Sequence, residues 1–438
     1  MIERIRKASS SDILRGLLCA LTAAFYIGAI FSPDLPEIFT GFWKIITNPA
    51  VLTKDYFFSE IGSVSGTMLN FALTGTFFCA LMFLPGANIT GVTLAAYGLS
   101  VGFCSYGINF LNILPFQVGI LLYSKIKKMP FVKNLNLAMF SCALGPLVSE
   151  VLFRYPGTEI HGFTLLGVVL ALAIGIVTGM TMPALCAFMP NTHKGYNLYN
   201  AGPAAGFLCF TLFNILYKVK AFDGAAAVAP AVAGTLGEGS PVFVNIFCIA
   251  VFVLILIAGY IINGNSFKGY GALVKDSGHK VDFAAKYGIG PCVINVGVYG
   301  LFILAYYNIV GAKFTGPTFG AIWNMLAFAA AGSTPLNVFP LMIGYYVASL
   351  IGVNPINAQA IVVGMCFCSG LAPVTGRYGV VAGFFGAILH YFLVTSVPAI
   401  HGGFTVYNGG FTAGLVCLVL VPVLEAYFKT KDERKLAK

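Results

Sequence analysis

Nearly uninterrupted apolar runs constrain the fold of this chain more than any other feature of its sequence. Ile13–Phe31 and Val242–Ile262 are two examples, and each approaches the roughly 20 residues with which a helix crosses a bilayer. Charged residues make up only 9% of the 438 positions, against 58% hydrophobic residues. A water-soluble surface needs about 25% charged residues. The sequence therefore predicts an all-α, polytopic membrane protein with about 12–14 membrane segments.

The distribution of charge excludes several kinds of partner. The net charge is +10, but the basic residues lie in short segments between apolar runs, as is typical of membrane loops. Because no continuous basic face is available for nucleic acid, we expect the lipid bilayer as the main partner. Assembly of several copies is left open. The eleven cysteines and five histidines show no metal-ligand spacing, so we expect neither a metal nor a cofactor.

The chain contains an internal duplication, which is the first feature to seek in a repetitive fold. A shift of 225 residues aligns Phe58–Ser124 with Phe283–Ser349, and eighteen of these 67 positions are identical. Identical pairs include Asn70 with Asn295, Asn112 with Asn337, and Pro115 with Pro340. A second block, at a shift of 208, aligns His193–Cys209 with His401–Cys417. Two related membrane domains are therefore expected.

We assign residues 1–220 to the first repeat and residues 221–438 to the second, and basic residues indicate their orientation. With a cytoplasmic N-terminus, three basic segments also lie inside: Lys125, Lys127, Lys128 and Lys133; Lys268, Lys275, Lys280 and Lys286; and Lys429, Lys431, Arg434, Lys435 and Lys438. The counterpart of the Lys125–Lys133 loop, Leu350–Asn357, has no basic residue and belongs outside. This asymmetry predicts inverted-topology repeats in the cell membrane, with both termini cytoplasmic.

Some basic residues oppose that scheme. Lys218, Lys220 and Lys313 fall on the outer side. A parallel repeat is the alternative, but it would leave the basic C-terminal tail outside, against the positive-inside rule.

Each repeat also carries a proline within an apolar segment. The two elements are Asn112-Ile-Leu-Pro115 and Asn337-Val-Phe-Pro340. Inverted repeats with broken helices or re-entrant hairpins are a common plan of transporters. Non-helical backbone at membrane depth persists only where protein or a water-filled cavity satisfies its polar groups. We therefore expect these elements to interrupt their helices near the centre of the protein, with Asn112 and Asn337 beside a solute.

The strongest local signal is a Tyr-Asn pair that both repeats retain. Tyr199-Asn200 and Tyr407-Asn408 each precede an apolar stretch, so they should lie near helix N-termini, where backbone N–H groups and the helix dipole face a ligand. Asparagine supplies a donor and an acceptor, and tyrosine supplies an aromatic wall with a hydroxyl. The alternative is that asparagine caps the helix and the neighbouring glycines allow close helix packing. We expect both pairs to converge on one polar cavity.

Charged residues within the apolar regions are scarce. An arginine at membrane depth usually marks a site or a specific partner, and Arg377 lies in a glycine-rich turn between two apolar segments. Arg154 is expected to snorkel to the interface, and Glu150, four residues earlier, could neutralise it. The acids in or beside apolar runs, Glu60, Glu150 and Glu425, have no acidic counterpart in the other repeat, so no proton or sodium relay is predicted.

Two families resemble this sequence. His401-Gly-Gly-Phe-Thr-Val-Tyr-Asn-Gly-Gly-Phe-Thr-Ala-Gly414, followed by Val421-Pro-Val-Leu-Glu425, resembles a bacterial membrane family known as a domain of unknown function. That resemblance covers nearly the whole chain and implies two repeats, but no activity. Gly195-Tyr-Asn197 and Leu114-Pro-Phe116 resemble elements of urea transporters, which also have two inverted halves. Gln117 and Gly403-Phe-Thr405 depart from that pattern, so the likeness makes urea only one candidate solute.

These observations favour a non-enzymatic function. We expect a transporter or channel for a small polar solute, with the pathway between the two repeats. The predicted solute-binding residues are Tyr199, Asn200, Tyr407, Asn408, Asn112, Asn337 and Arg377. One alternative is an integral-membrane enzyme acting on a lipid-linked substrate, which would need a nucleophile, an acid–base pair or a metal cluster at membrane depth. Another is a structural membrane subunit, which would have no continuous polar path.

Overall fold

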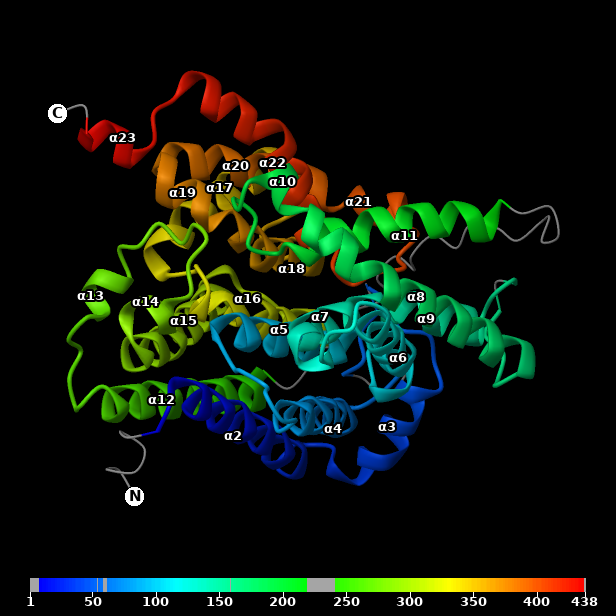
Figure 1. Cartoon of the computed structure of the whole chain (residues 1–438). Coiled ribbons are helices and arrows are strands. Elements are labelled where there is room, and N and C mark those ends of the chain that lie inside the picture. The colour runs from blue at the N-terminus through cyan, green and yellow to red at the C-terminus, as the bar shows by residue number, and fades with distance from the viewer. Residues whose placement is uncertain (1–7, 53, 58–60, 158, 219–240, 437–438) are drawn as a thin grey trace.

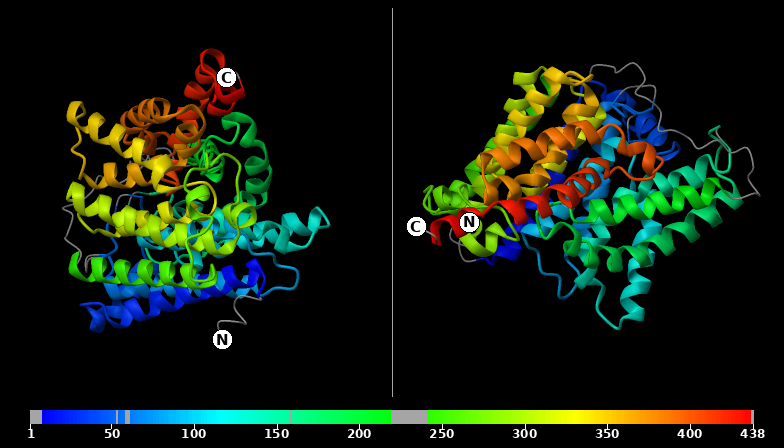
Figure 2. Two further views of the ribbon diagram at one scale, coloured as in Figure 1. Left: turned by 90° about the vertical axis from the view of Figure 1, so that its left-hand side faces the viewer. Right: turned by 90° about the horizontal axis from the view of Figure 1, so that it is seen from above.

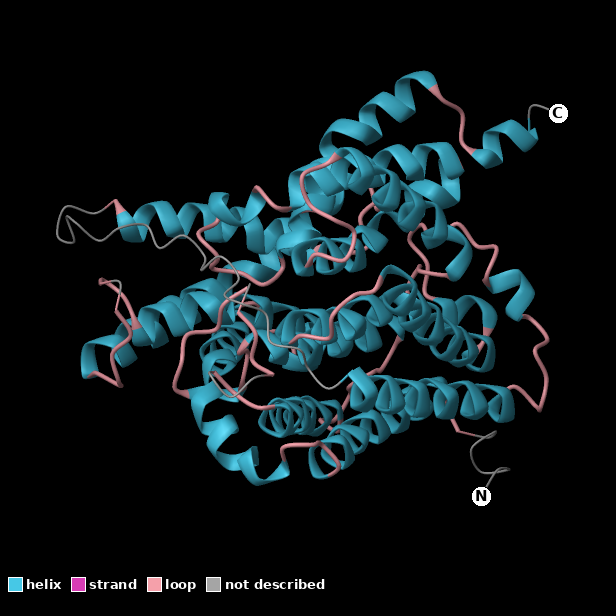
Figure 3. Cartoon of the chain, turned by 180° about the vertical axis from the view of Figure 1, so that it is seen from behind, coloured by secondary structure: helices cyan, strands magenta, loops and turns pink. Residues whose placement is uncertain are grey.

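The computed structural model describes residues 8–52, 54–57, 61–157, 159–218 and 241–436 (Figure 1). These residues form helices and connecting loops, with no strand among them (Figure 3). Eight helices are long and apolar enough to cross a membrane, and four shorter apolar helices have 10–17 residues. The protein is thus an all-α polytopic membrane protein, which confirms the fold class that the apolar runs predicted.

The longer helices follow the same order in the two halves. The first half contains α2 (Ser10–Ile30), η1 (Leu35–Glu37), α3 (Ile38–Ile46), α4 (Val64–Met82), α5 (Gly91–Gly102), η2 (Phe103–Tyr106), α6 (Phe110–Ile126), η3 (Phe131–Asn134), α7 (Leu135–Phe140), η4 (Ser141–Leu144), α8 (Gly145–Phe153), α9 (Leu165–Phe188), α10 (Pro190–His193) and α11 (Ala201–Tyr217). The second contains α12 (Pro241–Ile262), α13 (Tyr270–Leu273), α14 (Phe283–Tyr287), α15 (Ile289–Val310), α16 (Gly316–Leu326), η6 (Ala327–Ala330), α17 (Pro335–Ile351), α18 (Gln359–Cys368), η7 (Ser369–Leu371), α19 (Ala372–Tyr378), α20 (Val380–Val394), α21 (Val397–Ile400), α22 (Asn408–Tyr427) and α23 (Lys431–Leu436). The predicted boundary at residue 220 lies outside the described residues.

Each half contains one sharply broken helix. In the first half, α5 passes through the 3₁₀ turn η2 to Gly107, whose φ of 90° few other residues adopt, and α6 then begins. Asn70 donates from Nδ2 to the carbonyls of Cys104 and Ile108, which flank this break. Asn295 makes the equivalent bonds to Ala329 and Ser333 in the second half. The identical asparagines therefore satisfy carbonyls that the interrupted helices leave without partners.

The predicted position of the break was wrong. Helix runs continuously through Pro115 in α6 and through Pro340 in α17, and the interruption comes a few residues earlier. Each proline is the sixth residue of its helix, so it removes a single backbone hydrogen bond near the helix start. Room for the ring comes from Gly175, where a Cβ would lie 2.4 Å from Cβ of Pro115.

Asn112 and Asn337 instead help to start these two helices. Asn112 accepts from the backbone N–H of Asn109, and Asn109 accepts in return from that of Asn112. Thr334 and Asn337 form the same capping box in the second half. The Nδ2 atoms of the two asparagines donate to the carbonyls of the turning glycines, Gly107 and Gly332.

Equivalent helices of the two halves pack antiparallel. In the α5–α16 pair, a Cβ on Gly91 would lie 2.6 Å from the carbonyl oxygen of Ala330, and one on Gly316 would lie 2.8 Å from that of Ser105. These two contacts interchange under the 225-residue shift, so a local two-fold axis relates the helices. Asn324 donates to the carbonyl of Leu99 between them, at 3.0 Å.

The helix pairs α2–α12 and α11–α22 are also antiparallel. Phe25, near the end of α2, contacts Phe247, near the start of α12, with ring centroids 6.2 Å apart. The equivalent helices α2 and α12 form the lower layer of Figure 1 and of the left view in Figure 2. In the α11–α22 pair, a Cβ on Gly202 would lie 2.5 Å from the backbone of its own counterpart, Gly410. Small residues thus let the two halves approach closely, as they do in other helical membrane proteins.

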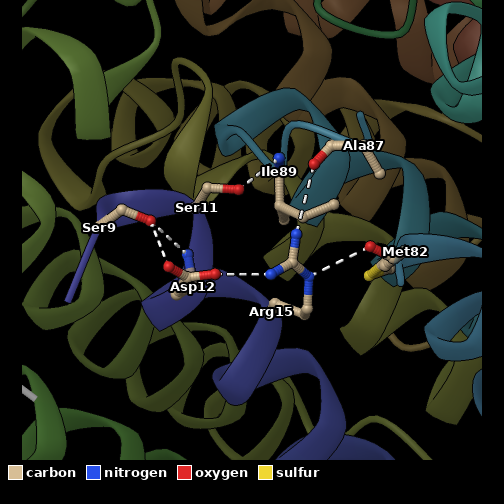
Figure 4. Close-up of polar contacts among 7 residues, drawn as sticks. All are labelled: Ser9, Ser11, Asp12, Arg15, Met82, Ala87 and Ile89. Carbon is tan, nitrogen blue, oxygen red and sulfur yellow. Dashed lines mark hydrogen bonds and ion pairs between the residues drawn. The ribbon is translucent and has the colours of Figure 1, made fainter. Parts of the chain in front are cut away.

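The start of α2 is fixed to the turn between α4 and α5 (Figure 4). Ser9 caps the helix by accepting from the backbone N–H of Asp12. Arg15 pairs with Asp12 at 2.6 Å and donates to the carbonyls of Met82 and Ala87. Its charge therefore stays at a helix end, where it satisfies the last carbonyl of α4 and one carbonyl of the following turn.

Candidate functional site

A cluster of buried aromatic rings lies where the two halves meet. The rings of Tyr199 and Tyr407, which are equivalent, have centroids 5.9 Å apart, and both side chains are fully buried. Tyr199 packs on Phe328 of the second half at 4.5 Å, and Tyr407 packs on Phe103 of the first half at 5.4 Å. Phe103 and Phe328 are equivalent under the 225-residue shift, so the contacts are reciprocal. The structure thus brings the two predicted tyrosines together at the interface.

Hydroxyl groups surround this cluster on the side of the second half. Tyr199 Oη lies 3.0 Å from Ser369 Oγ and donates to the carbonyl of Cys366 at 3.2 Å. The hydroxyl of Tyr299 is close enough to Ser333 and Ser369 to interact with them electrostatically. Under the 225-residue shift, the equivalents of Tyr299 and Ser333 in the first half are Thr74 and Ile108. The polar part of the centre therefore belongs mainly to the second half.

Some of these central hydroxyls have no hydrogen-bond partner within the described part of the chain. The clearest case is Tyr407 Oη, whereas Tyr299 Oη and Ser333 Oγ lie within interaction distance of each other. A buried polar group without a partner costs about 1–3 kcal/mol, and proteins retain few of them. A partnerless hydroxyl at the interface of the halves, beside other hydroxyls, is a candidate contact for a polar ligand.

The asparagines of the Tyr-Asn pairs each bond to a carbonyl at the end of a preceding helix. Asn200 Nδ2 donates to the carbonyl of Cys186, and its Oδ1 lies 2.9 Å from His193 Nε2. The residue four positions after Cys186 is Pro190, which has no N–H to offer that carbonyl. Asn200 therefore supplies the donor that the end of α9 lacks, and it makes no capping bond to its own helix.

The second half repeats the two contacts of this asparagine. Asn408 Nδ2 donates to the carbonyl of Val394 and its Oδ1 lies 3.1 Å from His401 Nε2, while Pro398 stands four positions after Val394. Each asparagine is thus engaged within its own half. The remaining predicted residue, Arg377, lies half-buried in the last turn of α19, 5.9 Å from the ring centroid of Tyr196.

A pocket of about 570 Å³ opens between the halves beside this centre. Its lining includes His193 and Asn200 from the first half and Lys280, Asp282 and Phe328 from the second. The volume is that of a small-molecule site. Phe328, which packs on Tyr199, is part of both the pocket wall and the aromatic cluster.

The equivalent surface on the other side of the two-fold axis is packed shut. Val92 in the pocket is 40% exposed, whereas its counterpart Pro317 is buried. Leu198 and Asn200 are partly exposed, whereas their counterparts Val406 and Asn408 are 0% and 7% exposed. The two halves therefore use matched residues to make an open surface on one side and a closed one on the other.

Two acids that the sequence analysis did not select border these surfaces. Asp282 Oδ2 accepts from the N–H of Gly91, the first residue of α5, and Asp55 Oδ1 accepts from that of Gly316, the first residue of α16, both at 2.8 Å. Each half therefore supplies the carboxylate at the start of the other half's interrupted helix, where the helix dipole favours a negative charge. The 225-residue shift aligns Asp55 with Lys280, so it does not reveal that the two acids are equivalent. A shift of 227 residues, which allows a gap of two, aligns Asp55 with Asp282.

The predicted ion pair between Glu150 and Arg154, at the end of α8, is present. Arg154 Nε lies 3.3 Å from Glu150 Oε1, which also accepts from the hydroxyl of Tyr217 at 2.6 Å. This confirms Glu150 as the partner of Arg154, and an ion pair whose carboxylate also accepts from Tyr217 explains a buried charge without a transport role.

Comparison with known proteins supplies a family. A family model described as "Protein of unknown function (DUF1576)" matches residues 35–218 and 262–426, one region in each half. The chain belongs to this family. No curated protein and no solved structure matches it, and the likeness to urea transporters finds no support.

Substitution of Asn200 tests its role at the end of α9. Asn200→Ala would leave the carbonyl of Cys186 and Nε2 of His193 without their partner, at a cost of about 1–3 kcal/mol. We therefore expect a lower unfolding temperature in detergent. Asn214→Ala is the matched control, because Asn214 on the same helix bonds only to the carbonyl of Phe210 at an exposed position. Equal unfolding temperatures for the two variants would contradict this role.

Asp55 should make stability depend on pH. It lies in the loop between α3 and α4, outside the candidate spans, and burial raises the pKa of its carboxyl from 3.8 to about 6. A raised pKa in the folded state contributes stability that is present below the unfolded pKa and is lost as pH rises through about 6. Asp55→Asn keeps an acceptor for Gly316 but does not titrate.

We therefore expect the unfolding temperature of the parent protein to rise relative to that of Asp55→Asn as pH falls from about 7.5 to about 4.5. Thermal unfolding of the two proteins side by side measures this difference. A difference that stays constant over the whole range would show that Asp55 does not titrate there.

Proposed function

We propose that the protein is a transporter or channel for a small polar solute, and that its two halves have opposite orientations in the membrane. The observation that supports this most is the pocket between the halves, whose matched counterpart is packed shut. Equivalent elements of the two halves build both the open pocket and the closed surface. If each half adopted the conformation of the other, the pocket would close and the closed surface would open. This is the basis of alternating access in inverted repeats.

The chemistry of the pocket supports a polar solute of modest size. Its lining combines apolar walls with His193, Asn200, Lys280 and Asp282, so both donors and acceptors are present. The partnerless hydroxyl of Tyr407, buried in the adjoining cluster, would offer a further contact to a solute that passes between the halves. A solute moving between the halves would exchange water for these groups.

The proposed orientation places the open pocket at the cytoplasm. Lys280 lies at its rim, and α13, α14, α23 and the start of α2 lie at one end of the molecule (Figures 1 and 2). These elements border the basic segments from Lys268 to Lys286 and from Lys429 to Lys435. The positive-inside rule assigns such an end to the cytoplasm, which supports cytoplasmic termini in a cell membrane.

Thiol labelling tests the open and closed surfaces. We expect a membrane-impermeant reagent to modify Val92→Cys from the cytoplasmic side of oriented vesicles, because Val92 lines the pocket. Pro317→Cys, at the equivalent closed position, should react slowly from either side. The background is Cys186→Ala, which removes the native thiol in the pocket. Equal labelling of both positions, or labelling of Val92→Cys from outside only, would contradict the proposed state.

Uptake measurements test the central hydroxyl. Tyr407→Phe removes a hydroxyl that makes no hydrogen bond to the described residues, so folding should be unaffected. If that hydroxyl contacts the solute, uptake into proteoliposomes at low solute concentration should fall about tenfold, because a lost polar contact is worth about 1–3 kcal/mol. A panel of small polar solutes, with and without ion gradients, identifies the substrate first. Absence of uptake for the whole panel would favour an enzyme or a structural subunit.

A further inference from the structure

A second pocket, of about 770 Å³, lies on the outside of the second half, away from the interface between the halves. It is bounded by α20, by α22 and by the C-terminal helix α23. Its walls are apolar, and Val381, Phe385 and Val423 remain 69%, 55% and 46% exposed. Helices of this composition present such side chains to lipid tails. The pocket is therefore a groove that a hydrocarbon chain can enter from the bilayer.

One end of this groove is basic. Lys429, Lys431 and Arg434 line it there, and all three are exposed. Arg434 donates from Nη2 to the carbonyl of Tyr378 at 2.9 Å, and Lys431 donates to that of Thr375 at 3.3 Å. These bonds hold the two side chains against the end of α19 while each keeps further N–H donors for a ligand.

The charge at this end is not neutralised by its own segment. Lys435 adds a fourth positive charge, while Asp432 and Glu433 are the acids between Lys429 and Lys435. Glu433 is occupied in capping α23, where it accepts from the backbone N–H and the hydroxyl of Thr430. An excess of positive charge therefore remains over the mouth of the groove.

The backbone at the mouth has the same electrostatic sign. Helix α20 begins here at Gly379, which provides no side-chain cap. A Cβ on Gly379 would lie 3.8 Å from Nη2 of Arg434 and 3.9 Å from Cε of Lys431. The positive end of the α20 dipole thus adds to the charge of the two side chains.

We propose that this groove binds an anionic phospholipid, with its phosphate at Lys429, Lys431 and Arg434 and an acyl chain along α20 and α22. A free anion would use the basic end alone and would leave the apolar walls exposed. A zwitterionic lipid would gain little from the three cations. Basic pockets beside membrane helices recognise anionic headgroups through this combination of charge and apolar surface.

The experiment compares ligands on the full-length protein in detergent. Phosphatidylglycerol, phosphatidylcholine and inorganic phosphate are titrated separately, with the unfolding temperature and native mass spectrometry as readouts. We expect phosphatidylglycerol to raise the unfolding temperature and to remain bound in the mass spectrum. Equal effects of phosphatidylcholine, or an equal effect of inorganic phosphate alone, would overturn the proposal.

Three variants locate the site. Lys429→Gln/Lys431→Gln/Arg434→Gln removes the charge and should weaken phosphatidylglycerol binding at least about tenfold, since three cations beside the headgroup are lost. Val381→Trp fills the groove and should also weaken binding at least about tenfold, because the acyl chain loses its place on the apolar walls. Lys125→Gln/Lys127→Gln/Lys128→Gln removes equal charge elsewhere and should bind normally. Because Lys431 and Arg434 also hold α23, Val381→Trp decides the outcome if the triple variant does not fold. Unchanged affinity of Val381→Trp for phosphatidylglycerol would overturn the proposal. So would a parent protein that is a dimer in detergent and becomes a monomer on Val381→Trp substitution, because a second copy would then occupy the groove.

Discussion

Backbone polar groups inside a bilayer must find partners within the protein, and this requirement underlies the whole structure. Water cannot satisfy a carbonyl or N–H in the hydrocarbon region, where each unsatisfied group costs several kcal/mol. Every interruption of a helix therefore needs a side chain assigned to it. Asn70 and Asn295 serve the carbonyls around the breaks, and Asn200 and Asn408 serve those that prolines leave free. The identical asparagines of the two halves are largely accounted for in this way.

The acids extend the requirement across the interface. Asp55 and Asp282 satisfy N–H groups at the starts of α16 and α5, each in the opposite half. Backbone contacts follow the same exchange, since the N–H of Leu198 donates to the carbonyl of Gly370 and that of Val406 donates to that of Ala143. Each half has backbone N–H groups that find their acceptor in the other half. The interface is therefore part of the folding unit. A surface that is both essential and duplicated is also suited to two alternative packings.

Much of the fold could be predicted because it depends on local composition and on repetition. Apolar runs revealed the helices, and the 225-residue shift revealed two related halves. The break was misplaced because proline was expected to interrupt the helix, whereas Gly107 and its 3₁₀ turn do so and Pro115 lies early enough in α6 to be tolerated. Sequence cannot distinguish these outcomes without knowing which carbonyls have other partners.

The site was predicted only in part, for a related reason. Tyr199 and Tyr407 meet at the interface, as equivalent residues near a two-fold axis must if they point inward. Asn200 and Asn408 were predicted to bind a solute. Their structural partners, the carbonyls of Cys186 and Val394, lie on a preceding helix, and the sequence does not show that contact. Retention in both halves identified important residues but did not separate structural from ligand-binding roles.

The exchanged carboxylates bear on how such a chain could have arisen. An isologous contact is one in which the same patch of two identical subunits meets itself, so that each contact occurs twice. The bonds from Asp55 to Gly316 and from Asp282 to Gly91 have this form within one chain. A single-copy ancestor could have made them only as a homodimer of antiparallel subunits. With the opposite orientations proposed for the two halves, such a homodimer would need one gene product to insert into the membrane in both directions, and fusion of two copies would then fix one orientation for each.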